Sequence, residues 1–322
     1  MEDRLESMSI EITKKCNFRC NFCFANSNKT PAKEDYISDD KINRLIHEIK
    51  ENNLIKVTIT GGEPLFEHEL FLRMIKKLHE NDITINLNTN ISLMTDQIAQ
   101  EIKEYIGDEF YIFTSLLSAD ERTCDYITGI QGSYRQVIEG IKCCKRNGLK
   151  VSLNFTISRD NVKDLILIDD FVKEYKIERV SISRVIPPSY ERNSERDILT
   201  EKEIKQIADS LVILNKKYGI SVASSHPLPL CVIGYDEKYD VIECQMCRAG
   251  LRHCAVNLLT GNVFACSQEN KNYGNIYEQS LYDCWITMKE GHGISNLANK
   301  CQACNFLSRC GGECKWSACT VC

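Results

Sequence analysis

Three cysteines near the N-terminus have the spacing of ligands to a metal cluster. Cys16, Cys20 and Cys23 form a CxxxCxxC motif that directly follows a strand-like segment, residues 7–13. Thiolates are the usual ligands of iron–sulfur clusters, and a loop with such short spacings can surround one cluster. A cubane of four irons needs four ligands, so three cysteines leave one iron open to bind another molecule. The spacing also fits one helix face, but the polar surroundings and the preceding strand disfavour that alternative.

The cysteine content points to metal chemistry along the whole chain. Of the 18 cysteines, six fall in residues 1–230 and twelve in the last 92 residues. The N-terminus has no apolar stretch typical of an export signal, so a secreted disulfide framework is disfavoured. In a reducing compartment such cysteines indicate metal or cluster ligands. We therefore expect a cytoplasmic metalloprotein.

Charge and hydropathy exclude two classes of partner. The net charge is −5 and the sequence pI is about 5.8, whereas a nucleic-acid footprint needs a clustered basic excess. No apolar run approaches the length of a membrane span. We expect no nucleic-acid partner and no membrane partner, and a chain of 322 residues fits one large domain and one small one.

Strand-like and helix-like segments alternate through the first two thirds of the chain. The predicted strands are residues 7–13, 56–60, 84–88, 110–116, 150–157 and 179–185. The predicted helices are residues 39–52, 67–81, 96–106, 133–147, 162–175 and 201–218. Six β–α repeats predict an α/β fold, a parallel sheet curled into a partial (βα)6 TIM-like barrel. Active sites of such barrels lie at the carboxyl ends of the strands, where the three-cysteine loop begins.

The second predicted strand ends in Gly61-Gly62-Glu63-Pro64. Two glycines allow the backbone to approach a ligand closely, and Glu63 offers a carboxylate to an ammonium group. By itself the segment could be a turn before a helix. Combined with the three-cysteine motif one strand earlier, it closely resembles the radical S-adenosylmethionine (SAM) superfamily.

That resemblance implies a cofactor site. The three cysteines would bind a 4Fe–4S cluster whose open iron is chelated by the amino and carboxyl groups of SAM, and the Gly-Gly-Glu segment would contact the amino group. Weaker matches, each of which could also be a cap, turn or surface residue, extend the predicted cofactor contacts. The full set is Phe22, Gly61, Gly62, Glu63, Asn88, Ser152 and Asn154.

The cysteine-rich tail resembles the SPASM domain, which carries two auxiliary 4Fe–4S clusters. Cys247 is followed after thirteen residues by Gly261, and Cys266 follows after four more. A C-x2-C-x5-C-x3-C run then extends from Cys301 to Cys314. A zinc site of four thiolates is the alternative for that run. The motifs earlier in the chain disfavour this alternative. The resemblance implies three 4Fe–4S clusters in total.

The resemblance also assigns ligands to the two auxiliary clusters. The first would be bound by Cys247, Cys254, Cys266 and Cys314, with Cys244 as the competitor of Cys254, because a hairpin around Gly261 is expected to bring Cys254 and Cys266 together. The second would be bound by Cys301, Cys304, Cys310 and Cys322, with Cys319 as the competitor of Cys322. The predicted domains are a radical SAM core, residues 1–220, a bridging segment, residues 221–243, and a SPASM domain, residues 244–322.

Members with such a tail mostly modify ribosomally made peptides, which makes thioether or carbon–carbon crosslinking the leading prediction. No N-terminal leader-recognition domain is expected, so a separate protein would recognise the leader or the recognition would be handled elsewhere, and a flavodoxin or ferredoxin would donate electrons. The alternatives are formylglycine formation, a small-molecule dehydrogenase and a haem-pathway enzyme. Formylglycine-forming enzymes place an Asp after the cysteine that corresponds to Cys266, where this chain has Ser267. An iron–sulfur carrier or zinc module without chemistry is the least favoured alternative, and no acid or base is assigned.

Overall fold

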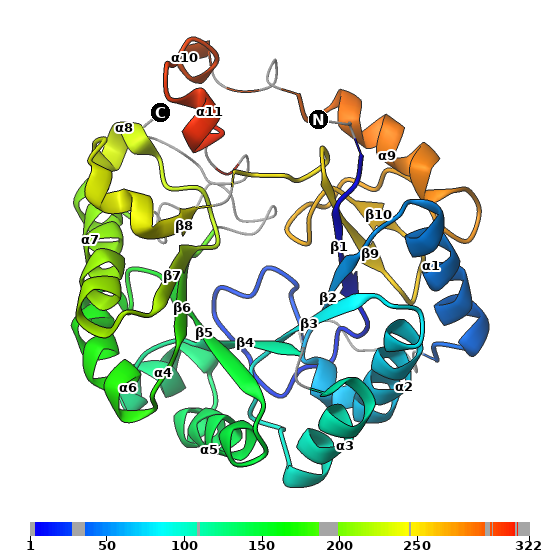
Figure 1. The fold of residues 1–322 in the computed structure, drawn as a ribbon, viewed down its shortest axis with the longest axis horizontal. Helices are drawn as coiled ribbons and strands as arrows, with labels where there is room; N and C mark the ends of the chain where they lie inside the picture. Colours follow the sequence, from blue (N-terminus) through cyan, green and yellow to red (C-terminus); the bar gives the residue numbers. More distant parts are fainter. Residues whose placement is uncertain are drawn as a thin grey trace.

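The computed structural model describes residues 4–27, 36–107, 110–186, 199–244, 246–293, 297, 299–312 and 314. One ten-stranded sheet forms its frame, in the order β10-β9-β1-β2-β3-β4-β5-β6-β7-β8. All neighbouring strands are parallel except β9 and β10, which are antiparallel. Figure 1 shows this sheet curving around a central opening with the main helices outside it. This is the predicted α/β architecture of a TIM-like partial barrel.

The first six strands and their helices agree with the predicted segments to within a few residues. The strands are β1 (Ser7–Glu11), β2 (Lys56–Thr60), β3 (Thr84–Thr89), β4 (Tyr111–Leu116), β5 (Lys150–Ile157) and β6 (Arg179–Arg184). The helices are α1 (Asp39–Glu51), η1 (Pro64–Glu67), α2 (His68–His79), α3 (Asp96–Ile106), α5 (Ser133–Arg146), η3 (Val162–Leu167), α6 (Ile168–Glu174) and α7 (Glu201–Tyr218). Thr200 begins α7 with a capping box, since it and Glu203 each accept a hydrogen bond from the other's backbone N–H.

Several shorter elements were not predicted. Two of them are strands, β7 and β8, which extend the sheet beyond β6. They are α4 (Glu121–Thr128), β7 (Ser221–Ser224), α8 (Leu230–Ile233), η5 (Glu237–Val241), β8 (Ile242–Cys244), α9 (Leu281–Glu290), α10 (Asn299–Gln302) and α11 (Leu307–Cys310). The expected hairpin around Gly261 is present as β9 (His253–Asn257) and β10 (Val263–Phe264).

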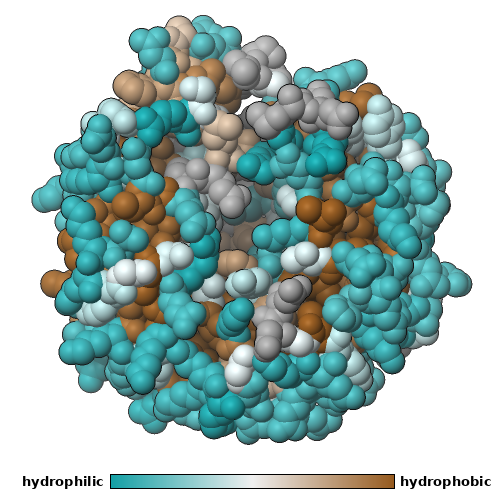
Figure 2. Space-filling view, viewed as in Figure 1, coloured by the Kyte–Doolittle hydropathy of each residue, from teal (hydrophilic) through white to brown (hydrophobic). Residues whose placement is uncertain are grey.

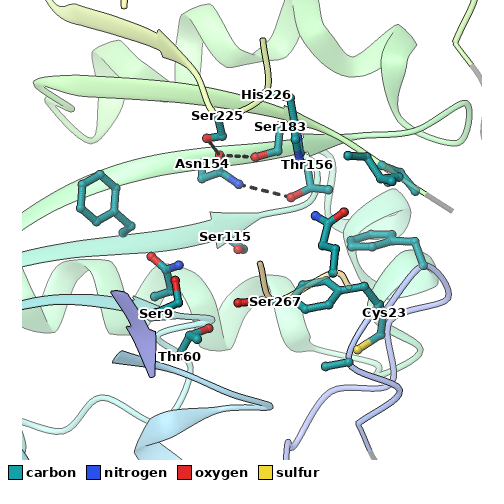
Figure 3. Close-up of a pocket in the computed structure, with 18 of the residues that line it drawn as sticks. Ser9, Cys23, Thr60, Ser115, Asn154, Thr156, Ser183, Ser225, His226 and Ser267 are labelled. Carbon is teal, nitrogen blue, oxygen red and sulfur yellow. Dashed lines mark hydrogen bonds between the residues drawn. The ribbon is translucent and has the colours of Figure 1, made fainter. Parts of the chain in front are cut away.

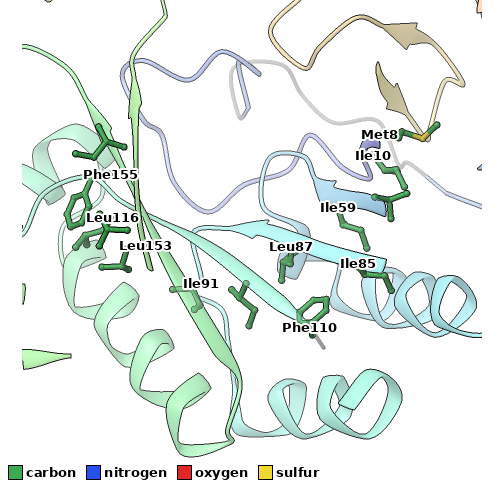
Figure 4. Close-up of a cluster of buried hydrophobic side chains, with 14 of the residues drawn as sticks. Met8, Ile10, Ile59, Ile85, Leu87, Ile91, Phe110, Leu116, Leu153 and Phe155 are labelled. Carbon is green, nitrogen blue, oxygen red and sulfur yellow. The ribbon is translucent and has the colours of Figure 1, made fainter. Parts of the chain in front are cut away.

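The alternation of side chains along each strand separates the core from the barrel interior. In β5, Leu153, Phe155 and Ile157 are at most 2% exposed and belong to the hydrophobic core between the sheet and the helices (Figure 4). Phe155 meets Phe171 of α6 edge to face, with ring centroids 6.3 Å apart. The intervening residue Asn154 faces the barrel interior. The helices therefore hold the sheet from outside and leave its polar face for a site.

The C-terminal region is built onto the same sheet. Strand β9 pairs in parallel with β1, and Ser7 lies opposite His253. Helix α1 also holds this region: Lys41 donates a hydrogen bond of 2.6 Å to the carbonyl group of Leu259, and the N–H of Leu281 donates one of 2.6 Å to Glu48. Across the described residues, no helix combines the length and apolarity that a membrane span requires.

Candidate active site

A cavity of about 580 Å³ opens into the barrel, and cysteines from both ends of the chain line it. Figure 2 shows the hollow at the centre of the molecule. The N-terminal set is Cys16, Cys20 and Cys23, and the C-terminal set is Cys247, Cys266 and Cys314. Figure 3 shows Cys23 and Ser267 on one side of the cavity and the polar side chains of β5, β6 and the segment after β7 on the other. The two predicted cysteine groups therefore share one cavity.

The cysteine loop after β1 is held by α4, an element missed in the sequence. The N–H of Arg19 donates a hydrogen bond of 2.8 Å to the carbonyl group of Thr128, and that of Asn21 donates one of 3.1 Å to Ile127. Both acceptors lie in the last turn of α4, where carbonyl groups have no partner within the helix. The loop thus satisfies the end of this helix and gains a fixed position.

The two glycines after β2 allow the cysteine loop to pack directly on the backbone. A Cβ atom on Gly61 would lie 2.4 Å from the carbonyl oxygen of Thr13, and one on Gly62 would lie 2.2 Å from that of Lys15. The N–H of Gly62 donates a hydrogen bond of 2.7 Å to Thr13. Any side chain here would displace the loop that carries the cysteines. Both glycines also line the cavity, so their backbone remains available to a ligand.

Glu63, predicted to contact the amino group of SAM, has a carboxylate surrounded by donors of the protein itself. Its side chain is fully buried, and the residue is not among those that line the cavity. Its carboxylate accepts hydrogen bonds from the hydroxyl group of Thr89 at 2.6 Å and from the N–H groups of Asn90 and Leu65 at 2.6 and 2.9 Å. This placement gives the carboxylate a structural role, whereas Gly61 and Gly62 line the cavity.

Burial raises the pKa of three thiols in the two cysteine sets, two in the N-terminal set and one in the C-terminal set. It raises the pKa of Cys16 to about 11 and that of Cys266 to about 12, and it raises the pKa of Cys20 further. Each pKa is also raised by the neighbouring thiols of its own set. Closely spaced buried thiols become thiolates when a cation binds them, so cluster binding would release protons. Such donor sets fit iron–sulfur clusters, which thiolates hold.

The structure separates Cys254 from the other cysteines predicted to hold the first auxiliary cluster. In the hairpin, Val263 lies opposite Val256, and Phe264 lies opposite Ala255. Continuing this register places Cys266 opposite His253, on the cavity face, and Cys254 on the other face. Cys254 is fully buried, and its pKa is raised by burial and by Cys284 of α9. The hairpin expected to unite Cys254 with Cys266 therefore points their side chains in opposite directions.

Cys244, the alternative to Cys254, ends β8 three residues before Cys247, and its side chain lies outside the described part of the structure. The three cysteines predicted for the second auxiliary cluster lie around α10 and α11 and are half-buried. Cys304 Sγ accepts a hydrogen bond of 3.4 Å from the N–H of Phe306. Cys319 and Cys322 lie outside the described residues. Among the described residues, no group of three His, Cys, Asp or Glu side chains is placed so that it could hold a metal ion.

The remaining predicted cofactor contacts lie on the inner face of the barrel. Phe22, Asn88 and Asn154 line the cavity, whereas Ser152 is buried and does not. Asn154 Oδ1 accepts hydrogen bonds from the hydroxyl groups of Ser183 and Ser225, at 2.8 and 3.2 Å (Figure 3). The cavity wall therefore presents amides and hydroxyl groups that can bind the polar parts of a ligand.

Two histidines in the cavity wall were not predicted. His226 accepts a hydrogen bond of 3.3 Å from the backbone N–H of Arg184, and His253 Nδ1 lies 2.9 Å from the hydroxyl group of Ser7. Burial lowers the pKa of each to about 4, so both are neutral near pH 7. The sequence signal was weak because both strands involved are short. His226 follows β7, which has four residues, and His253 begins β9, which has five.

The sequence matches the radical SAM superfamily over residues 10–172. With the barrel and cysteine loop described above, this match shows that the chain belongs to that superfamily. It is 27% identical to the Fe-coproporphyrin III synthase of Methanosarcina barkeri over 64% of this chain and 50% of that protein. It is 23% identical to the radical SAM cyclopropyl synthase TigE of Paramaledivibacter caminithermalis over 97% of this chain and 68% of TigE. The fold is similar to that of SuiB from Streptococcus suis bound to the precursor peptide SuiA, with a TM-score of 0.74 and 19% identity over 97% of this chain and 72% of SuiB.

Proposed function

We propose that the protein is a radical SAM enzyme that forms a thioether or carbon–carbon crosslink in a ribosomally made peptide. The observation that carries this proposal is the single cavity lined by both cysteine sets. A substrate in that cavity would lie between a SAM-binding cluster and an auxiliary cluster. Such a position suits an oxidation that removes a hydrogen atom at one side and an electron at the other.

The cofactors would be held by residues from three parts of the chain. Cys16, Cys20 and Cys23 would hold the SAM-binding 4Fe–4S cluster, and the backbone of Gly61 and Gly62 would receive the amino group of SAM. Two of the amide side chains that line the cavity, Asn88 and Asn154, would contact polar atoms of SAM. Phe22 lies between Cys20 and Cys23 in the cysteine loop and also lines the cavity.

The tail would hold two auxiliary 4Fe–4S clusters, in a region that we propose is a SPASM domain of residues 244–322. Cys247, Cys266 and Cys314 would bind the first cluster, and Cys244 is preferred over Cys254 as the fourth ligand because Cys254 points away from them. Cys301, Cys304 and Cys310 would bind the second cluster together with Cys322 or Cys319. The remaining proposed parts are the core, residues 1–220, and the bridging segment, residues 221–243.

When bound, the reduced cluster and SAM supply a 5′-deoxyadenosyl radical that abstracts a hydrogen atom from an unactivated carbon. Bond formation to a second substrate atom then releases one proton and one electron, so the crosslinked product has lost two hydrogens. The auxiliary cluster is the proposed electron acceptor. The described cavity wall has no carboxylate, and burial lowers the pKa of its two histidines to about 4, so both are neutral near pH 7.

The peptide assignment is supported by a structural relative that binds a precursor peptide and by a cavity wall rich in hydrogen-bonding groups. A haem-pathway reaction is the second candidate, since a coproporphyrin synthase is among the relatives. We further propose a separate leader-recognition protein, an electron donor of the flavodoxin or ferredoxin type, and a cytoplasmic location.

The test is anaerobic incubation of the reconstituted protein with SAM, a reductant and the peptide encoded beside its gene. The proposal expects 5′-deoxyadenosine and a peptide that has lost two hydrogens per crosslink. A parallel reaction with iron coproporphyrin distinguishes the second candidate. Conversion of the porphyrin without any change in the peptide would contradict the peptide assignment.

A further inference from the structure

The turn that follows β3 places one amide side chain against the cysteine loop. Asn90 Nδ2 lies 3.9 Å from Sγ of Cys16 and 3.0 Å from Oδ1 of Asn17. An amide nitrogen has two hydrogens, so it can donate to both acceptors at once. Cys16 Sγ also accepts from the backbone N–H of Phe18 at 3.4 Å. Two N–H groups from different parts of the chain therefore converge on this sulfur.

The orientation of the Asn90 amide is fixed by its oxygen atom. Oδ1 accepts a hydrogen bond of 3.0 Å from the backbone N–H of Ser92 and one of 2.6 Å from the Ser92 hydroxyl group. A backbone N–H can only donate, so the oxygen must face Ser92 and the nitrogen must face Cys16. Asn17 Nδ2 donates to the same Ser92 hydroxyl group at 2.8 Å, which closes the network between the two loops.

A hydrogen bond also fixes the backbone of Asn90. Its N–H donates a hydrogen bond of 2.6 Å to the buried carboxylate of Glu63, whose other oxygen accepts from Thr89 and Leu65. Burial raises the pKa of Glu63 to about 7, and the hydrogen bonds to its ionised form are the stronger kind. Glu63 therefore connects the glycine turn after β2 to the amide donor after β3.

The next residue has a strained backbone. Ile91 is β-branched and fully buried, yet its φ angle is +60°. This conformation is an outlier for such a side chain and persists only where the surroundings enforce it. A Cβ atom on Gly140 of α5 would lie 2.2 Å from the Ile91 carbonyl oxygen, so α5 has a glycine where this turn needs space. Packing and hydrogen bonds therefore keep Asn90 in one position and enforce the strained backbone of Ile91.

We propose that Asn90 is a positioning residue of the SAM-binding cluster: its amide N–H donates to the Cys16 thiolate and raises the reduction potential of the cluster. This inference rests on the proposal that Cys16, Cys20 and Cys23 hold the cluster. Reduction adds negative charge to the cluster and its sulfurs, and an N–H directed at a sulfur stabilises that charge. Hydrogen bonds to the sulfurs are one of the factors that set such potentials.

The test is a redox titration of the reconstituted holoenzyme, followed by the EPR signal that changes when SAM is added. Asn90→Leu removes both side-chain donors and should lower the ratio of reduced to oxidised cluster about tenfold at a fixed potential, a shift of 59 mV for one electron. Asn81→Leu, at the end of α2 and outside the cavity lining, is the matched control and should leave the ratio unchanged. A merely structural role for Asn90 would change the melting temperature without changing this ratio.

A second measurement begins with the wild-type protein. In holoenzyme labelled with 15N at asparagine side chains, the reduced cluster without SAM should show a 15N hyperfine coupling. This coupling tests the hydrogen bond to Cys16 even if the Asn90→Leu variant carries no cluster. The Asn90→Ser variant should lose that coupling. An unchanged potential in a cluster-bearing Leu variant, or no 15N coupling in the wild type, would overturn the inference. A wild type with iron but no SAM-sensitive signal would instead overturn the cluster assignment, and the inference with it.

Discussion

Glu63 and Thr89, at the carboxyl ends of neighbouring strands β2 and β3, are joined by a hydrogen bond of 2.6 Å between carboxylate and hydroxyl group. The residue predicted to contact SAM is fully buried and has hydrogen-bond partners within the protein. The glycine turn on one side of it contacts the cysteine loop, and Asn90 on the other side contacts Cys16. One carboxylate therefore connects the backbone proposed to bind SAM with the loop proposed to hold the cluster.

This connection can be tested by Thr89→Val, which removes the hydrogen bond that the hydroxyl group donates to the buried carboxyl group of Glu63 and the one that it accepts from the N–H of Ile91. We expect the free energy of unfolding of the cluster-free protein to fall by about 1.5–3 kcal/mol, as measured by denaturant titration. Ser118→Ala is the control, because it removes the bond that a buried hydroxyl group donates to Asp164 and the one that it accepts from the N–H of Asp120, away from this network. Glu63→Gln should also lower stability, because its NH2 group would face donors. If Glu63→Gln weakened SAM binding without any loss of stability, Glu63 would be a SAM ligand.

The N-terminal cysteines should act as one unit. A protein with Cys16→Ala, Cys20→Ala and Cys23→Ala should form no 5′-deoxyadenosine, because the open iron is lost with its cluster. The auxiliary clusters have separate ligands, so most of the iron should remain. Formation of 5′-deoxyadenosine at the wild-type rate, measured by chromatography, would refute the assignment.

Cys247 and Cys254 should differ sharply in their effect on iron. Cys247→Ala should remove one cluster, since Cys247 lines the cavity with Cys266 and Cys314. Cys254→Ala should keep all iron and lower stability by about 1 kcal/mol, the usual scale for a small buried truncation. Iron assays and denaturant unfolding of both variants provide the measurement. Loss of a cluster in Cys254→Ala would mean that the hairpin register differs from the one described.

The tail should contain iron and not zinc. Anaerobically reconstituted protein should hold about twelve irons, four for each of three thiolate-bound cubanes, and Cys304→Ala should hold about eight. That variant should make less product while some uncoupled 5′-deoxyadenosine remains. About four irons with stoichiometric zinc, determined by metal analysis, would leave the auxiliary-cluster proposal without support.

The two cavity histidines predict the pH dependence of stability. The pKa of each is lowered to about 4 in the folded protein, whereas an unfolded histidine titrates near 6.5. The unfolded chain therefore binds more protons in this window, and the stability that is present above about pH 6.5 should be lost as the pH falls toward 4. Denaturant unfolding of the cluster-free protein at several pH values should show a smaller loss in His253→Gln than in the wild type. Identical pH profiles would show that His253 is not buried in its neutral form.

The local patterns predicted the core of the fold well because each repeat contains its own signals. Strand β5 and helix α7 have the bounds expected from hydrophobic periodicity and from the Thr200 cap. The short strands β7 and β8 contain too few residues for a periodic pattern. The pairing of β9 with β1 joins residues about 246 positions apart, and no local signal encodes such a contact.

For the candidate site, spacing identified the cysteines but could not orient them. The hairpin was expected from the turn at Gly261, yet one residue of register decides whether Cys254 faces the cavity or α9. The same holds for Glu63. Its motif predicts a carboxylate near the ligand, but the hydrogen bonds that the carboxylate accepts from Thr89, Asn90 and Leu65 are visible only in the structure.

Because β1 pairs with both β2 and β9, one of its edges remains unpaired during synthesis until β9 has been made. A fragment that stops after residue 243 would expose that edge, with the backbone N–H and C=O groups of residues Ser7–Glu11 open to other chains. Isolated production of the barrel without its tail should therefore favour self-association. The tail therefore covers this edge in the finished chain, whatever metal it carries.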